Sequence, residues 1–131
     1  MTDRDARLLA LRPHVEAEAA SGVAGFLHGT LRPVLKLQNE ALLAIVAADV
    51  RKRVPGFAGF APDDQREKLA ALLRKDSRLK RMLLGVVLGA LTADELAFAL
   101  SHEAEVRRRV VALVAERVAS QTAEVVRRVS A

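Results

Sequence analysis

The residues best suited to bind another molecule are the lysines and arginines between positions 66 and 81. Seven basic residues stand there against two acids, and this excess equals the +5 net charge of the whole chain. Arg74, Arg78 and Arg81 recur at helical spacing, with Lys75 beside them, so they would line one face of a helix. Such a face can follow the phosphate backbone of a nucleic acid.

The same residues also fit an ordinary solvated helix surface. Throughout the chain an acid precedes a base by four residues, which is the orientation that stabilises a helix surface. The pairs are Asp3–Arg7, Asp49–Arg53, Asp64–Lys68, Asp76–Lys80, Glu103–Arg107, Glu105–Arg109 and Glu124–Arg128. The chain has no Tyr or Trp for base stacking and no convincing helix-turn-helix spacing. Nucleic-acid binding is therefore the alternative interpretation, and a solvated surface is the first one.

Metal and catalytic sites find little support. His14 and Glu18 are four residues apart and could share a helix face, but a metal site needs three or four ligands, and no matching pair follows. Nucleophile elbows, phosphate-binding glycine loops and zinc-protease motifs do not occur. Cysteine is absent, which excludes disulfides and thiolate chemistry. We expect a protein that is not an enzyme and holds no metal or cofactor.

The composition predicts that helices position these side chains. Of the 131 residues 51% are hydrophobic, chiefly Ala, Val and Leu, and the only aromatic residues are four Phe. Such small and medium side chains favour helix-on-helix packing over a strand-rich fold. We predict an all-α helical bundle of five or six helices in one domain, 1–131, with N-terminal helices in 3–53, a loop at 54–62 and C-terminal helices in 63–129.

Prolines and capping residues set the predicted boundaries. In the first part we expect helices at 3–11, 13–27 and 33–53, because Arg12-Pro13 and Arg32-Pro33 each resemble a helix start. The next helix starts at Pro62, and Asp76 or Ser77 caps another.

Met82–Leu91 is the most apolar run, and Gly85 and Gly89 within it would allow close helix packing. The run is shorter than the roughly 20 residues that cross a bilayer, so we predict no membrane span. The capping box Thr92-Ala93-Asp94-Glu95 then starts the last helical region.

The last region, 93–129, contains neither proline nor glycine. As one amphipathic helix it would be about 55 Å long, more than a compact chain of this size spans. It therefore either breaks near Ser101-His102 or projects toward a partner. Its valine ridge must be buried against something; the ridge comprises Val106, Val110, Val114, Val118, Val125 and Val129.

The first functional hypothesis is a non-catalytic assembly module that forms a homodimer through the valine ridge, with binding to another protein also open. Phe57 and Phe60 in the 54–62 loop are either partner anchors or interior plugs. The first alternative is nucleic-acid binding by Arg74, Lys75, Arg78 and Arg81. The second is a small apolar ligand between helices lined by Gly22, Gly25, Gly85 and Gly89. A charged N-terminus unlike a signal peptide, together with the lack of cysteine, fits a cytoplasmic protein.

Overall fold

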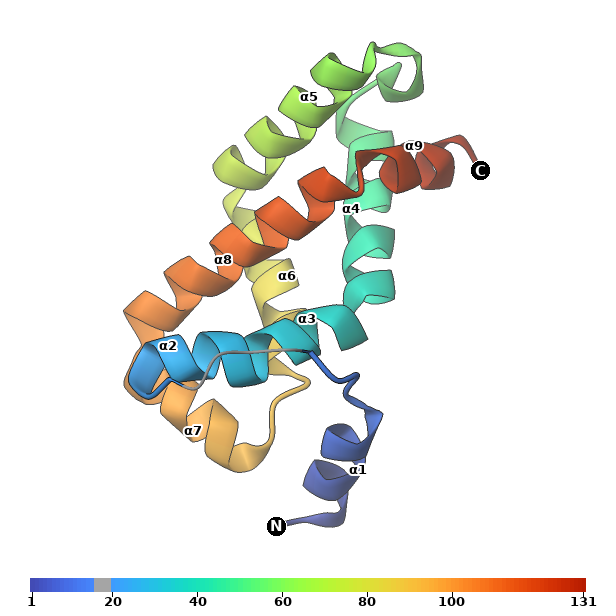
Figure 1. Cartoon of the computed structure of the whole chain (residues 1–131). Helices are drawn as coiled ribbons and strands as arrows, with labels where there is room; N and C mark the ends of the chain where they lie inside the picture. Colours follow the sequence, from blue (N-terminus) through green and yellow to red (C-terminus); the bar gives the residue numbers. More distant parts are fainter. Residues whose placement is uncertain (16–19) are drawn as a thin grey trace.

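The computed structural model describes residues 1–15 and 20–131. Within these ranges the regular secondary structure is entirely helical, which confirms the predicted all-α class. The elements are α1 (Asp3–Leu11), α2 (Gly22–Phe26), a π-helical turn η1 (Leu27–Leu31), α3 (Arg32–Leu37), α4 (Asn39–Arg53), a 3₁₀ turn η2 (Phe57–Gly59), α5 (Pro62–Lys75), α6 (Ser77–Leu88), α7 (Ala93–Ser101), α8 (Glu103–Ser120) and α9 (Thr122–Ser130). The described residues therefore form more and shorter helices than the predicted five or six (Figure 1).

The helical run from Gly22 to Leu37 differs from the prediction. Residues 12–15 are not helical, and α2 begins at Gly22, whose φ of +63° suits glycine. From there α2, η1 and α3 follow one another with helical backbone angles at each junction. The wider π turn lies directly before Pro33, which has no N–H to offer a regular α turn. Pro33 is therefore inside the helical run and does not start it.

The 54–62 loop positions Phe57 in the core. Gly56 adopts a left-handed conformation with φ of +75°, and η2 follows it. Phe57 is only 1% exposed, and Phe60 is half-buried against the core. Phe57 is therefore an interior plug, and its assignment as a partner anchor is wrong. For the half-buried Phe60 the two interpretations stay open.

Helix starts in the second half were predicted correctly. Asp76 caps α6, because its carboxylate accepts a hydrogen bond from the backbone N–H of Leu79 at 3.0 Å. Thr92 and Glu95 form the predicted capping box at the start of α7. In it the Thr92 hydroxyl accepts from the Glu95 N–H, and the Glu95 carboxylate accepts from the Thr92 N–H at 2.8 Å.

The predicted long C-terminal helix is divided into α7, α8 and α9. One break lies at His102, which confirms the predicted break near Ser101-His102. Another, which was not predicted, lies at Gln121. Polar side chains donate to backbone carbonyls in the last turn before each break. Ser101 donates to Phe98 at 2.8 Å, and Thr122 donates to Ala119 at 2.7 Å. The breaks let α9 turn back and pack against α4 (Figure 1).

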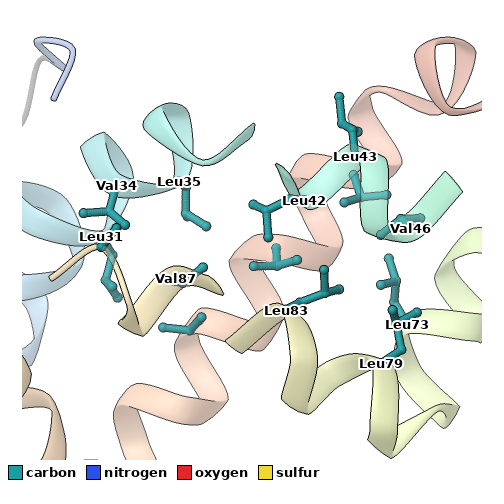
Figure 2. Packing of buried hydrophobic residues seen from close by; sticks show 14 of the residues in the cluster. Leu31, Val34, Leu35, Leu42, Leu43, Val46, Leu73, Leu79, Leu83 and Val87 are labelled. Atoms are coloured by element: carbon teal, nitrogen blue, oxygen red, sulfur yellow. The ribbon is translucent and has the colours of Figure 1, made fainter. Parts of the chain in front are cut away.

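The core lies where α4, α5, α6 and α8 meet. Figure 2 shows leucine and valine side chains of η1 and α3, α4, α5 and α6 pointing toward one another across this space. The labelled residues, each at most 3% exposed, are Leu31, Val34, Leu35, Leu42, Leu43, Val46, Leu73, Leu79, Leu83 and Val87.

The valine ridge is part of this same core. α8 packs against α5 and α6, and α9 packs against α4. The ridge residues on α8 and Val125 on α9 are at most 2% exposed within the single chain, and Val129 is half-buried against the core. The chain covers five ridge residues with its own helices, so their assignment as an oligomer interface is wrong: Val106, Val110, Val114, Val118 and Val125. For the half-buried Val129 the assignment stays a prediction.

At the other end of the molecule, polar contacts attach α1 to the connection between α6 and α7. The Arg4 guanidinium donates to the carbonyls of Gly89 at 2.9 Å and Leu91 at 3.1 Å. The buried carboxylate of Asp5 accepts from the backbone N–H of Ala93 at 3.3 Å. Charged side chains of α1 therefore hold this helix by hydrogen bonds to backbone atoms of the connection between α6 and α7.

Candidate anion-binding grooves

The predicted basic face does not form as a single helix face. Arg74 and Lys75 end α5, whereas Arg78 and Arg81 belong to α6, and Asp76 interrupts the helix between them. Arg78 also donates to the buried carboxylate of Asp49 on α4. The prediction that the four cations share one helix face is therefore wrong, although Arg74, Lys75, Arg78 and Arg81 are all exposed.

Asp49 and Asp76 organise a structural ion-pair network. Arg53 Nε lies 3.4 Å from Asp49 Oδ1, which confirms the predicted pair, and Arg53 Nη1 lies 3.4 Å from Asp76 Oδ2. The hydrogen bond from the Leu79 N–H holds the pKa of Asp76 below its usual value. Partial burial acts in the other direction, and the neighbouring arginines add to the lowering. This network joins α4 to the junction of α5 and α6.

A basic groove lies between α6 and α8. Its volume is about 380 Å³, and its apolar floor is Leu84 and Val111. Cations from both helices line it, namely Lys80, Arg81, Arg107 and Arg108, together with Ser77. No acid is among these lining residues. The spacing argument missed Lys80, Arg107 and Arg108, and the Arg107-Arg108-Arg109 run was the only signal in the sequence for α8.

The cations of this α6/α8 groove differ in how they are engaged. Arg107 pairs with Glu103 at 3.1 Å, and Lys80 donates to the Arg74 carbonyl at 2.9 Å. Within the described part of the chain, Arg81 and Arg108 make no ion pair and are exposed. These two guanidiniums are therefore available to an external anion.

A second basic groove adjoins the first. It has a volume of about 520 Å³ and runs beside α5, where Lys68, Lys75 and Arg53 line it with Asp76. Ser77, the first residue of α6, lines both grooves. Positive charge therefore continues from α5 across the start of α6 to α8. We call this set the basic track: Lys68, Lys75, Lys80, Arg81, Arg107 and Arg108.

The glycine predictions are wrong in detail. Gly85 is exposed, and a Cβ placed on it would meet no heavy atom within 4 Å. Gly89 is also exposed, as the C-cap of α6. Neither glycine brings two helices close together. Gly22 and Gly25 lie on α2, and none of the grooves above is lined by a glycine.

Metal ligands and membrane spans were the remaining features that the sequence raised. No group of three His, Asp or Glu residues there could hold a metal ion. Glu18, half of the candidate His14–Glu18 pair, lies outside the described residues. Among the described helices, none combines the length and apolarity that a bilayer crossing requires.

Three comparisons, with protein-family models, with curated proteins and with solved structures, found no match to this chain. The fold and the basic track are therefore interpreted from their own residues.

The remaining aromatic side chains also bear on the site. Phe26 and Phe57 are buried, and Phe60 and Phe98 are half-buried. Phe98 packs between Phe26 and His102, with ring centroids 4.9 Å and 4.4 Å away, and Lys68 lies over the Phe60 ring. Since these are all four phenylalanines of the chain, no exposed aromatic platform accompanies the basic track.

Proposed function

We propose that this protein binds the phosphate backbone of nucleic acid along the basic track. The observation that carries the proposal is the pair Arg81 and Arg108. They come from different helices, line one groove without an acid, and make no ion pair within the described part of the chain. Neighbouring cations of one sign along a surface attract phosphates and release their counterions.

The form of the track supports backbone recognition rather than base reading. Sequence-independent single-strand binders stack bases on exposed aromatic side chains, and none of the phenylalanine rings of this chain is exposed. A groove with an apolar floor and a cationic rim can hold phosphates without contacting base edges. We therefore propose binding that depends strongly on salt and little on sequence.

The test is fluorescence anisotropy with a labelled duplex and a single strand of equal length, each of arbitrary sequence, titrated between about 50 mM and about 200 mM salt. Arg81→Ala with Arg108→Ala should weaken binding and reduce the slope of log K against log salt by about 2 for duplex. Both side chains are exposed, so the variant should keep its fold.

Arg109→Ala is the matched control for Arg108→Ala. It removes the same charge one position away on α8, at an exposed residue that does not line the groove. Equal weakening by both single variants would show that only net charge matters, and the proposed track would be withdrawn. Lack of binding to either nucleic acid at the lower salt would end the proposal altogether.

A further inference from the structure

A separate hollow lies on the other side of α8, between α8, α3 and the segment at His14 and Val15. Its volume is about 730 Å³, within the usual range of small-molecule sites. Arg117 lines it and lies nine residues after Arg108, which is two and a half turns at about 3.6 residues per turn. The hollow and the basic track therefore use opposite sides of the same helix.

The hollow combines an apolar floor with a polar rim. Leu35 is buried, and Val15 and Leu113 are half-buried, so these side chains supply apolar surface. Arg32 and Lys36 are four residues apart, and both line the hollow from α3. Like charges at this spacing slightly destabilise a helix. Neither forms an ion pair with another described residue.

The opposite wall holds Arg117 in a hydrogen-bonded network. Asn39 and Gln121 exchange two amide hydrogen bonds, at 2.9 Å and 2.8 Å. Arg117 Nη1 donates to the same Asn39 oxygen at 3.3 Å, and the Gln121 amide donates to the Arg117 carbonyl at 3.1 Å. The network thereby reduces the freedom of the Arg117 side chain before any ligand arrives. Side chains that are already positioned lose less entropy on binding.

We infer that this hollow binds a small amphipathic anion. An oxyanion head group would lie among Arg32, Lys36 and Arg117, and an apolar body would lie against Leu35 and Leu113. Charge-assisted hydrogen bonds from guanidinium groups suit a carboxylate or a phosphomonoester. Among the described lining residues Glu116 is the only acid, against Arg32, Lys36 and Arg117, so the described rim carries an excess of positive charge.

Three probes separate the contributions of head group and tail. Decanoate carries both, decanol carries the tail alone, and acetate carries the head group alone. In isothermal titration of the full chain, decanoate should bind saturably with one molecule per chain. It should bind at least about tenfold more tightly than either decanol or acetate, because each lacks half of the contacts.

Variants connect the binding to this site. Arg32→Met with Lys36→Met keeps two long apolar stems but removes both charges, and should weaken decanoate at least about tenfold. Both residues are exposed, so the fold should survive, which circular dichroism checks. Arg81→Met with Arg108→Met is the charge-matched control. It should leave decanoate affinity unchanged, because these residues line the groove on the other side of α8.

Two results would overturn the inference. One is the lack of saturable decanoate binding up to about 1 mM. The other is equal decanoate affinity of the Arg32/Lys36 variant and the unchanged chain. Equal affinity for decanol and decanoate would likewise overturn the role of the charged head group. None of these results bears on nucleic-acid binding by the basic track, so the two proposals fail separately.

Discussion

Arg12 and Glu95 form a two-pronged ion pair across 83 positions of sequence. Nη1 of Arg12 donates to Oε2 of Glu95 at 2.6 Å, and Nη2 donates to Oε1 at 2.5 Å. The Arg12 side chain is only 9% exposed. Because Oε1 of Glu95 also accepts from the Thr92 N–H, one carboxylate both caps α7 and anchors the chain that follows α1.

Glu95→Gln should therefore cost more stability than loss of a surface pair. The amide keeps an acceptor for the Thr92 N–H but leaves the mostly buried guanidinium of Arg12 without its counter-charge. We expect a loss of about 1–3 kcal/mol in the free energy of unfolding, measured in urea. Arg7→Gln, which breaks the exposed pair with Asp3, is the control and should cost less than about 0.5 kcal/mol. Equal losses would show that the Arg12–Glu95 pair contributes no more to the free energy of unfolding than an exposed pair does.

The same carboxylate predicts a pH dependence. Partial burial alone would raise the pKa of Glu95, but hydrogen bonds from Arg12 and Thr92 outweigh it and hold the pKa below the usual 4.5. A lowered pKa in the folded state adds stability above pH 4.5, and this is lost as the pH falls through the folded-state pKa. The protection of α1 amides from hydrogen exchange, measured relative to the intrinsic exchange rate at each pH, should therefore fall below that pH. In Glu95→Gln the loss of protection should be smaller, and an identical profile would contradict the assignment.

Local signals predicted local structure well. Three helix starts depend only on residues within four positions of one another, so spacing alone predicts them. They are the cap at Asp76, the capping box of Thr92 and Glu95, and the start at Pro62. The predicted helix start at Pro33 was wrong because a π turn lets the helix continue past this proline. No nearby residue predicts that turn.

Tertiary partners decided the remaining features. The pairing of Arg78 with Asp49 joins residues 29 positions apart, and the α6/α8 groove takes its cations from two helices. As one straight helix the region of the valine ridge would be too long for this chain to cover. Because the helix breaks at His102 and Gln121, the chain folds back and buries the ridge in its own core. Periodicity showed that the valines are buried, but it could not show which surface buries them.

The burial of the valine ridge can be tested with neighbouring residues on α8. Val110 is 0% exposed, whereas Val111 is half-buried and faces the α6/α8 groove. Val110→Ala should lower stability by roughly 1–3 kcal/mol, and Val111→Ala should cost clearly less. The thermal midpoint of either variant should not change with protein concentration. A midpoint that rises with concentration would instead show that association buries the ridge.

Glycine substitutions distinguish an open helix position from a required turn. Gly85 lies within α6, exposed, with no heavy atom within 4 Å of an added Cβ. Gly85→Ala should therefore stabilise the protein by about 0.5–1 kcal/mol, because alanine favours the helix. Gly56→Ala is the contrasting variant and should destabilise, since its φ of +75° strains any side chain. Thermal unfolding measures both, and destabilisation by Gly85→Ala would restore a close-packing role for that glycine.

Asp49→Asn links the stability of the fold to the proposed binding of phosphate. Asp49 is 7% exposed and pairs with both Arg53 and Arg78, so the substitution leaves Arg78 without its counter-charge and Arg53 with Asp76 alone. Stability should fall by about 1–3 kcal/mol in urea. Nucleic-acid affinity at low salt should rise, because the second groove, which Arg53 lines, loses a neighbouring negative charge. Asp63→Asn, an exposed acid at the start of α5 that does not line either groove, is the control. An affinity gain in the control as large as that in Asp49→Asn would mean that binding follows overall charge and not the arrangement around α6.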